Sequence, residues 1–257
     1  VVSSPEARAR PAAFFGWAAI RAGREFVGPL PSGKEPAVDG ERPSRKPIAP
    51  QFSSFNSGAL AGKIVYLTAG HGLSAGAGST GSWSTDRDVN NGVVEDYGNQ
   101  DQLQSFADYI LRAGGTVAPL RPIGNQSAEV VLDNDSPGVT FTGAWSNVTT
   151  GLHYDEDYGT VPDAVRFRFA TISPAETATA TYAPTFTQAG FYPVYTWVTS
   201  GTNRARQSYT VSHSGGATTI AVDHRNVGRG WVYLGTYHFE TRQSGSVKIS
   251  NQSASGT

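Results

Sequence analysis

Between residues 128 and 250 the sequence repeats short runs in which apolar and polar residues alternate, separated by turn residues. Alternation with a period of two is typical of strands that bury one face. The clearest runs are "FYPVYTWVT", "QSYTVSH", "TTIAVDH" and "GWVYLGTYHFE", and two further predicted strands are "EVVLD" and "GSVKIS". Many short strands at close, regular spacing predict an antiparallel β-sandwich. Pro193, inside the first of these runs, predicts an edge strand or a bulge.

Residues 61–122 carry a different pattern, that of a small α/β unit. "KIVYLTA" and "TVAPLR" are predicted strands, and residues 99–113 between them are a predicted helix. Asn99 is the expected N-terminal cap and Gly114 the expected glycine after the helix. The apolar positions at helical spacing are Leu103, Phe106, Ala107, Ile110 and Leu111. Strand, helix and strand predict a right-handed parallel crossover, and two strands alone leave its sheet incomplete.

The N-terminal segment, residues 1–60, is rich in Pro, Arg, Ser and Gly. Such a composition buries too little apolar surface to fold alone, so we expect an extended arm. The predicted organisation is therefore an arm over residues 1–60, an incomplete α/β unit over 61–124 and a β-sandwich over 125–257. The fold class that this organisation predicts is α+β, mainly β.

The composition excludes several classes of site and partner. The formal net charge of −1 gives no basic surface for nucleic acid, and no run approaches the length of a membrane span. The chain has no cysteine, which rules out disulfides and thiolate metal sites and suits a bacterial protein outside the cytoplasm. It also has no methionine, so we expect a processed, secreted chain.

The first predicted strand runs into His71, which is flanked by Gly70 and Gly72. A histidine at the carboxyl end of such a strand lies where α/β sheets bind ligands, and zinc takes His, Asp and Glu ligands. Glu95, just before the predicted helix, faces the same crevice. The alternatives remain a tight turn for His71 and a carboxylate favoured by the helix dipole for Glu95.

"KIVYLTAGHG" and "GVVEDYGNQDQLQSFADYILRAGGTVAPLR" resemble the first half of the zinc-dependent N-acetylmuramoyl-L-alanine amidases, which cut peptidoglycan. The resemblance implies that His71 and Glu95 are zinc ligands. The third ligand histidine and the late general-base glutamate of that family have no counterpart in this sequence. We therefore predict an incomplete metal site and no catalytic residues.

Residues 129–253 look like the golvesin C-terminal-like domain, a carbohydrate-binding-like module of xanthan lyase. The resemblance runs through "VVLDNDSPGVTFTGAWSNVTTG", "FYPVYTWVTSGTNRARQSYTVSHSGG" and "GRGWVYLGTYHFETRQSGSVKISNQS". The last strand of that family is missing after "ISNQSASGT". The sandwich is therefore expected to leave an open edge, which is a template for a strand of another chain.

The candidate sugar contacts are the aromatic residues Trp83, Tyr154 and Tyr158, with core packing as the alternative for aromatic side chains. The glycosylation motif Asn-x-Ser/Thr occurs at three candidate sites, Asn125, Asn147 and Asn251. Such motifs are also common by chance in a chain rich in Ser and Thr.

Three functions are compatible with these features. The first is an extracellular structural protein that assembles with itself, into a filament or a surface layer, by donating a strand from residues 1–60 to the open edge. The second is a zinc-dependent peptidoglycan amidase with an inserted carbohydrate-binding module. The third is a glycan-binding module on an inactive hydrolase scaffold, with cell-wall or exopolysaccharide glycans as partners.

Overall fold

The computed structural model describes residues 57–70, 73–75, 83–85, 87–92, 94–120, 123, 130–149, 167–242 and 245–253. Most of the predicted arm, residues 1–56, lies outside these ranges, so its extended form stays a prediction. The described residues form a structure with far more strand than helix. The mainly β fold class and its antiparallel sandwich are confirmed.

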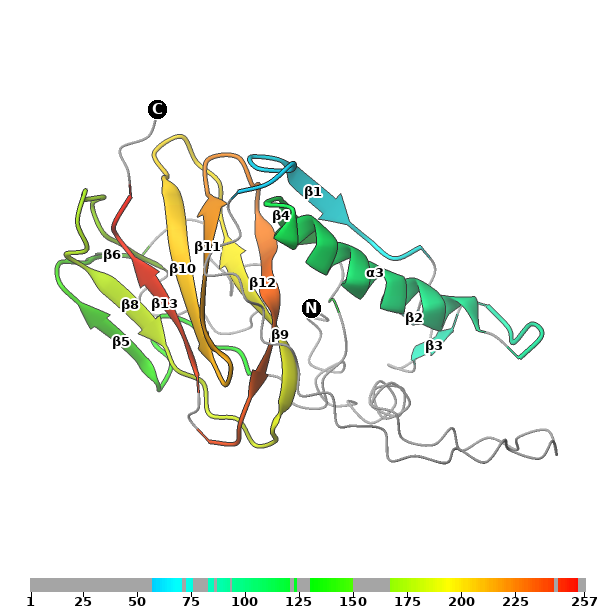
Figure 1. Ribbon diagram of the computed structural model, residues 1–257. Helices are drawn as coiled ribbons and strands as arrows, with labels where there is room; N and C mark the ends of the chain where they lie inside the picture. The colour runs from blue at the N-terminus through cyan, green and yellow to red at the C-terminus, as the bar shows by residue number, and fades with distance from the viewer. Residues whose placement is uncertain are drawn as a thin grey trace.

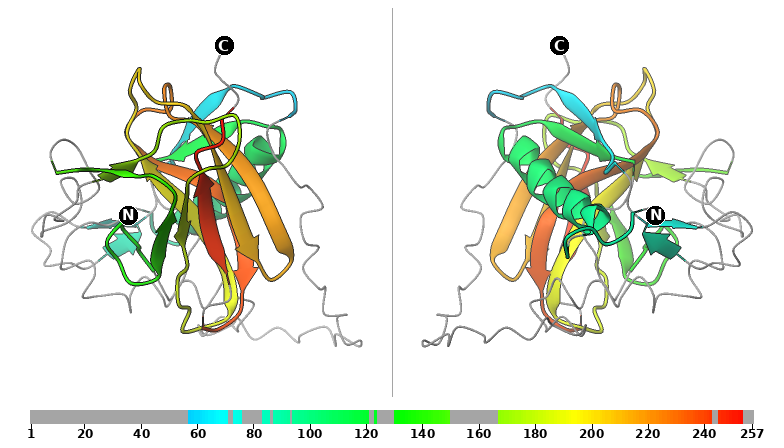
Figure 2. Two further views of the ribbon diagram at one scale, coloured as in Figure 1. Left: turned by 90° about the vertical axis from the view of Figure 1, so that its left-hand side faces the viewer. Right: turned by 90° about the vertical axis from the view of Figure 1, so that its right-hand side faces the viewer.

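Two sheets and one helix stack in three layers (Figures 1 and 2). The helix, α3 (Glu95–Arg112), covers the outer face of a mixed sheet. That sheet contains, in order, β1 (Ile64–Leu67), β4 (Thr116–Pro119), β12 (Gly230–Phe239) and β9 (Gly190–Val198). The antiparallel sheet contains β11 (Gly216–Asp223), β10 (Arg206–His213), β13 (Ser246–Ser250), β8 (Thr179–Tyr182) and β5 (Val139–Thr142). Two ribbons pair β2 (Leu73–Ala75) with β3 (Trp83–Thr85) and β6 (Ser146–Val148) with β7 (Phe167–Phe169).

The mixed sheet joins the helix–strand unit, which we define as β1, α3 and β4, to the sandwich. β1 pairs with β4 in parallel, with Val65 beside Val117, as the crossover pattern predicts. β4 then pairs antiparallel with β12, where Val117 lies beside Tyr233. The two strands of the unit are therefore completed by β12 and β9, and the sheet continues across the predicted boundary between residues 124 and 125.

The strand β12 is buried on both faces because it lies between α3 and the antiparallel sheet. Tyr233 points toward α3, where its hydroxyl meets Asp108, whereas Tyr237 stacks on His213 of β10 with ring centroids 4.6 Å apart. The change of face is made by a bulge: Tyr233 pairs with Tyr195 of β9, but the next pair joins Gly235 to Val194. One extra residue in β12 thus turns the following side chains toward the sandwich interior.

The helix α3 begins four residues earlier than predicted. Asn99 therefore lies inside the helix and is not its cap; Val94 occupies the cap position. Gly114 follows the helix with φ = 86°, as predicted for a terminating glycine. The predicted apolar stripe is confirmed except at Phe106, which is 54% exposed, because the mixed sheet covers only the face that carries Leu103, Ala107, Ile110 and Leu111.

Two predictions for the sandwich had opposite outcomes. Pro193 does lie on an edge strand, β9, which is one of the places where sheets tolerate proline. The predicted strand "EVVLD" was wrong for its described part, residues 130–133. Asp133 begins a turn, in which its carbonyl accepts from the Ser136 N–H at 2.9 Å, and Val130 and Val131 are exposed.

Asp108 of α3 and Tyr233 of β12 join the helix to the sheet through a hydrogen bond. The Tyr233 hydroxyl, which is fully buried, donates to Asp108 Oδ1 at 2.6 Å. Burial raises the pKa of Asp108 above its usual value of 3.8, although the Tyr233 hydrogen bond and the charge of Arg112 both lower it. The folded protein therefore holds a proton on this carboxyl group up to a higher pH than the unfolded chain does.

The bulge at Gly235 gives a first prediction, on stability. Gly235 has φ = 122°, and a β-carbon there would lie 2.5 Å from the Tyr237 hydroxyl oxygen. Gly216, with φ = 124°, has no atom within 4 Å of the same position. We expect Gly216→Ala to lower the free energy of unfolding by about 1–2 kcal/mol through backbone strain, and Gly235→Ala by about 2 kcal/mol more through the added clash. Urea unfolding measures both; equal losses would contradict a clash with Tyr237.

The raised pKa of Asp108 gives a second prediction. Protonation of Asp108 stabilises the fold fully below the unfolded pKa, and this contribution is lost as the pH rises through the higher folded pKa. Asp108→Asn keeps an acceptor oxygen for Tyr233 and removes the charge. We expect the variant to be at least as stable as the wild type at pH 7, with the difference shifting in favour of the wild type as the pH falls toward 4. Urea unfolding across this range measures it, and a constant loss above about 1 kcal/mol would contradict it.

Candidate functional site

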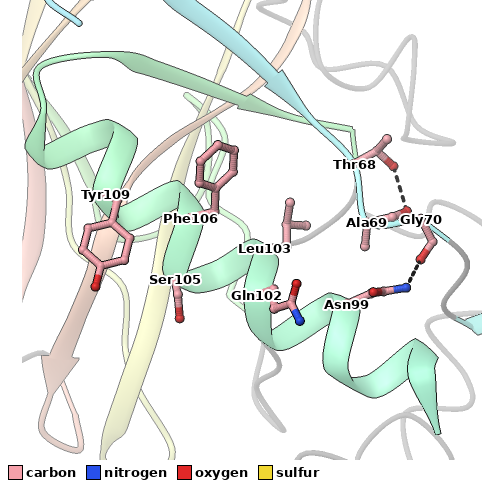
Figure 3. A pocket seen from close by; sticks show the side chains of 9 residues that line it. All are labelled: Thr68, Ala69, Gly70, Asn99, Gln102, Leu103, Ser105, Phe106 and Tyr109. Atoms are coloured by element: carbon pink, nitrogen blue, oxygen red, sulfur yellow. Dashed lines mark hydrogen bonds between the residues drawn. The ribbon is translucent and has the colours of Figure 1, made fainter. Parts of the chain in front are cut away.

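An open hollow of about 580 Å³ lies along α3 beside the carboxyl end of β1 (Figure 3). We call it the α3 hollow. Its volume is within the range of roughly 300–1,000 Å³ that is common for ligand pockets. The described residues that line it are Thr68, Ala69, Gly70, Asn99, Gln102, Leu103, Ser105, Phe106 and Tyr109.

One side-chain hydrogen bond ties the helix to the strand end at this hollow. Asn99 Nδ2 donates to the carbonyl oxygen of Gly70 at 2.9 Å. Asn99 can reach Gly70 because the helix starts at Glu95, which places Asn99 one turn inside it. The hydrogen bond therefore fixes the distance between α3 and the segment that leaves β1.

The side chains of α3 line the hollow from two flanks. Figure 3 shows Asn99, Leu103 and Phe106 projecting on the side of the β1 end, and Ser105 and Tyr109 projecting from the other flank. Leu103 is buried, whereas Phe106 and Tyr109 are 54% and 72% exposed. Residues three apart on a helix are surface neighbours. The two aromatic rings are thus close in position along α3 and are presented to solvent from its two flanks.

The chemistry of the α3 hollow combines apolar rings with groups that both donate and accept hydrogen bonds. Gln102 contributes an amide, and Thr68 and Ser105 contribute hydroxyl groups. Exposed aromatic rings offer flat apolar area to a ligand. A ligand that carries an apolar face and many hydroxyl groups fits this combination; a small ion does not use the rings.

The predicted metal ligands are only partly within the described residues. His71 lies outside them, and Glu95 is the exposed first residue of α3. Among the residues that the structure describes, no three His, Asp or Glu side chains are grouped to hold a metal ion. A zinc site formed by His71 and Glu95 therefore stays a prediction.

The predicted sugar contacts fall largely outside the described part of the chain. Tyr154 and Tyr158 lie outside it. The backbone of Trp83 belongs to β3 and pairs with Ala75 of β2. A role for any of the three in glycan binding stays a prediction.

The three glycosylation motifs lie in different surroundings. Asn125 is outside the described residues, and Asn147 is exposed in β6. Asn251 is buried: its Oδ1 accepts from the backbone N–H groups of Thr177 and Ala178, and its Nδ2 donates to the Thr171 carbonyl and the Thr177 hydroxyl. Both amide hydrogens are thus used to hold β13 in place, which leaves no position for a glycan on the folded chain.

The residues that shape the α3 hollow were missed as candidates for function. Phe106 was assigned to the buried face of the helix, and Gln102, Ser105 and Tyr109 were not considered. The sequence does contain a sign of this site: at helical spacing, Tyr109 lies off the apolar stripe that Leu103, Ala107 and Ile110 form. An aromatic residue off the buried stripe of a helix faces solvent.

Comparison with known proteins bears on the sandwich. Residues 130–257 match the family described as the Golvesin C-terminal domain. A xanthan lyase of Bacillus sp. (strain GL1) is 33% identical over 138 residues, which are 53% of this chain and 14% of that protein. A solved xanthan lyase structure from Paenibacillus, also 33% identical, covers 49% of this chain and 11% of its own, with a TM-score of 0.41.

The matches cover only part of this chain and a small part of the relative. This chain spans about a seventh of the curated xanthan lyase that it matches. The family match begins after β4, so the amidase-like character of residues 61–124 stays a prediction. The structure also contains no described helix that is long and apolar enough to cross a membrane. Residues 130–257, which contain most of the sandwich, are similar along their length to the golvesin C-terminal domain, as the sequence resemblance predicted.

Proposed function

We propose that this chain is a glycan-binding module that acts outside the cell and holds a sugar chain in the α3 hollow. The similarity of residues 130–257 to a domain that also occurs in a xanthan lyase is the observation that carries the proposal. The hollow supplies the surface chemistry that such a function needs: two exposed rings, an amide and hydroxyl groups.

The place of the hollow supports a role in binding extended chains. Phe106 and Tyr109 follow each other along the axis of α3, and the hollow is open along the helix. Sugar rings of an extended polysaccharide also follow one another in a row, and each has an apolar face of C–H groups. Two exposed rings one after the other on a rigid helix can therefore contact successive sugar units, with little entropy lost by the protein.

The proposal predicts that loss of either ring weakens glycan binding. We expect Phe106→Ala and Tyr109→Ala each to reduce affinity for a bound polysaccharide about tenfold, because each removes one stacking surface. Phe191→Ala is the matched control, since Phe191 is a similarly exposed phenylalanine, on β9 outside the hollow. Affinity electrophoresis in gels that contain soluble polysaccharides measures all three variants.

The same experiment can overturn the proposal. Substitutions of exposed side chains should leave the melting temperature nearly unchanged, which is checked in parallel. Absence of retardation of the wild type by every polysaccharide would exclude glycan binding by this chain. An equal loss in Phe191→Ala and in the two hollow variants would place binding elsewhere on the molecule.

Self-assembly and zinc-dependent amidase activity remain two alternative functions for this chain, and a single experiment tests both. The hydrogen bond from Asn99 to Gly70 favours the amidase, because Asn99 lies one helical turn after Glu95 and Gly70 is the residue that precedes His71 in the sequence. The edge strands β5 and β11 of the antiparallel sheet favour strand addition. Negative-stain microscopy and zinc analysis of one purified sample separate them: filaments support assembly, one zinc per chain supports the amidase, and metal-free monomers contradict both.

A further inference from the structure

The described residues that line the α3 hollow are all uncharged. They provide apolar side chains, a phenol, two hydroxyl groups and two amides, and no lysine or arginine. Sites that recognise carboxylates or phosphates typically use arginine or lysine, because charge-assisted hydrogen bonds offset the loss of solvation of the anion. The lining therefore suits an uncharged ligand.

The charged groups of α3 around the hollow are mainly acidic. Glu95 is exposed one turn before Asn99. Asp108 faces β12, where it accepts the hydrogen bond of Tyr233. Arg112, in the last turn, is the one described basic residue of this helix, and its charge acts on Asp108. The sequence of α3 contains four acidic residues and one basic residue, so an anionic polymer laid along this helix would gain no net attraction from its charges.

The hydrogen-bonding groups of the hollow match those of sugar hydroxyls. A hydroxyl group both donates and accepts, as do the side chains of Thr68, Ser105 and Gln102. These groups accept either orientation of a sugar hydroxyl and need no fixed charge. Phe106 and Tyr109 supply the apolar contact beside them.

From this lining we infer that the α3 hollow binds a neutral polysaccharide and discriminates against polysaccharides that carry uronic acids. This inference rests on the proposed glycan-binding function and adds the class of glycan to it. It also separates the specificity of this chain from its similarity to xanthan lyase. That similarity concerns residues 130–257, whereas the described residues that line the hollow all come before residue 110.

The test uses the whole chain and two sets of soluble polymers. The neutral set is laminarin, galactomannan and hydroxyethylcellulose; the acidic set is alginate, polygalacturonate and xanthan. We expect retardation by at least one neutral polymer, insensitive to added salt, and at least tenfold weaker binding of the acidic polymers. Salt screens interactions between exposed charges and leaves stacking in place, so the salt series distinguishes the two kinds of binding.

A charge placed in the hollow sharpens the test. Gln102→Lys adds one cation to the hollow, and Thr140→Lys adds the same charge to an exposed position on β5 as the control. We expect Gln102→Lys to bind polygalacturonate about fivefold more tightly than Thr140→Lys does at low salt, an advantage that added salt removes.

The outcomes separate the inference from the function on which it rests. Wild-type protein that binds no polymer of either set contradicts the proposed function. Wild-type protein that prefers acidic polymers, with binding weakened by Tyr109→Ala, keeps the proposed function and overturns the neutral specificity. Equal gains in affinity for polygalacturonate in Gln102→Lys and Thr140→Lys would show that a charge in the hollow acts no differently from a charge elsewhere on the surface. That result would overturn the assignment of the α3 hollow as the binding surface.

Discussion

The structure depends on the strand β12, and within it on Tyr233. This one residue lies beside Val117 of β4, contacts the ring of Tyr195 in β9 and donates a hydrogen bond to Asp108 of α3. It therefore connects the helix–strand unit to the sandwich. Because Tyr233 is fully buried, its hydroxyl needs a partner, and Asp108 meets that need at the cost of a buried carboxyl group.

The position of β12 also determines where a ligand can bind. Since β12 extends the sheet of β1 and β4, one face of α3 packs on that sheet and the opposite face is left to solvent. The buried face holds Leu103, Ala107 and Ile110, and the solvent side presents Tyr109. The candidate site thus lies on a helix held by the core, and a rigid element presents its side chains with less loss of entropy than a loop does.

The sequence predicted the kinds of element well and their boundaries less well. The strands β9 to β13 were found because alternation and turns agree in that region, and the parallel crossover of β1 and β4 was found because a helical stripe separates two apolar runs. The start of α3 was placed four residues late because Asn99 looks like a cap. In the fold Asn99 bonds the distant Gly70, a contact 29 residues away that no local pattern contains.

Local sequence by itself determined the alternation of the sandwich strands and the terminating glycine after α3, and it limited Pro193 to an edge or a bulge. Each of these follows from the backbone geometry of a few neighbouring residues. Only the tertiary structure decided that β4 pairs with β12, that Phe106 is exposed, and that Asn251 is a buried bridge. These facts depend on which surfaces meet. A helical or strand period tells which residues share a face, but the partner that covers the face is chosen by packing between segments that lie far apart in the sequence.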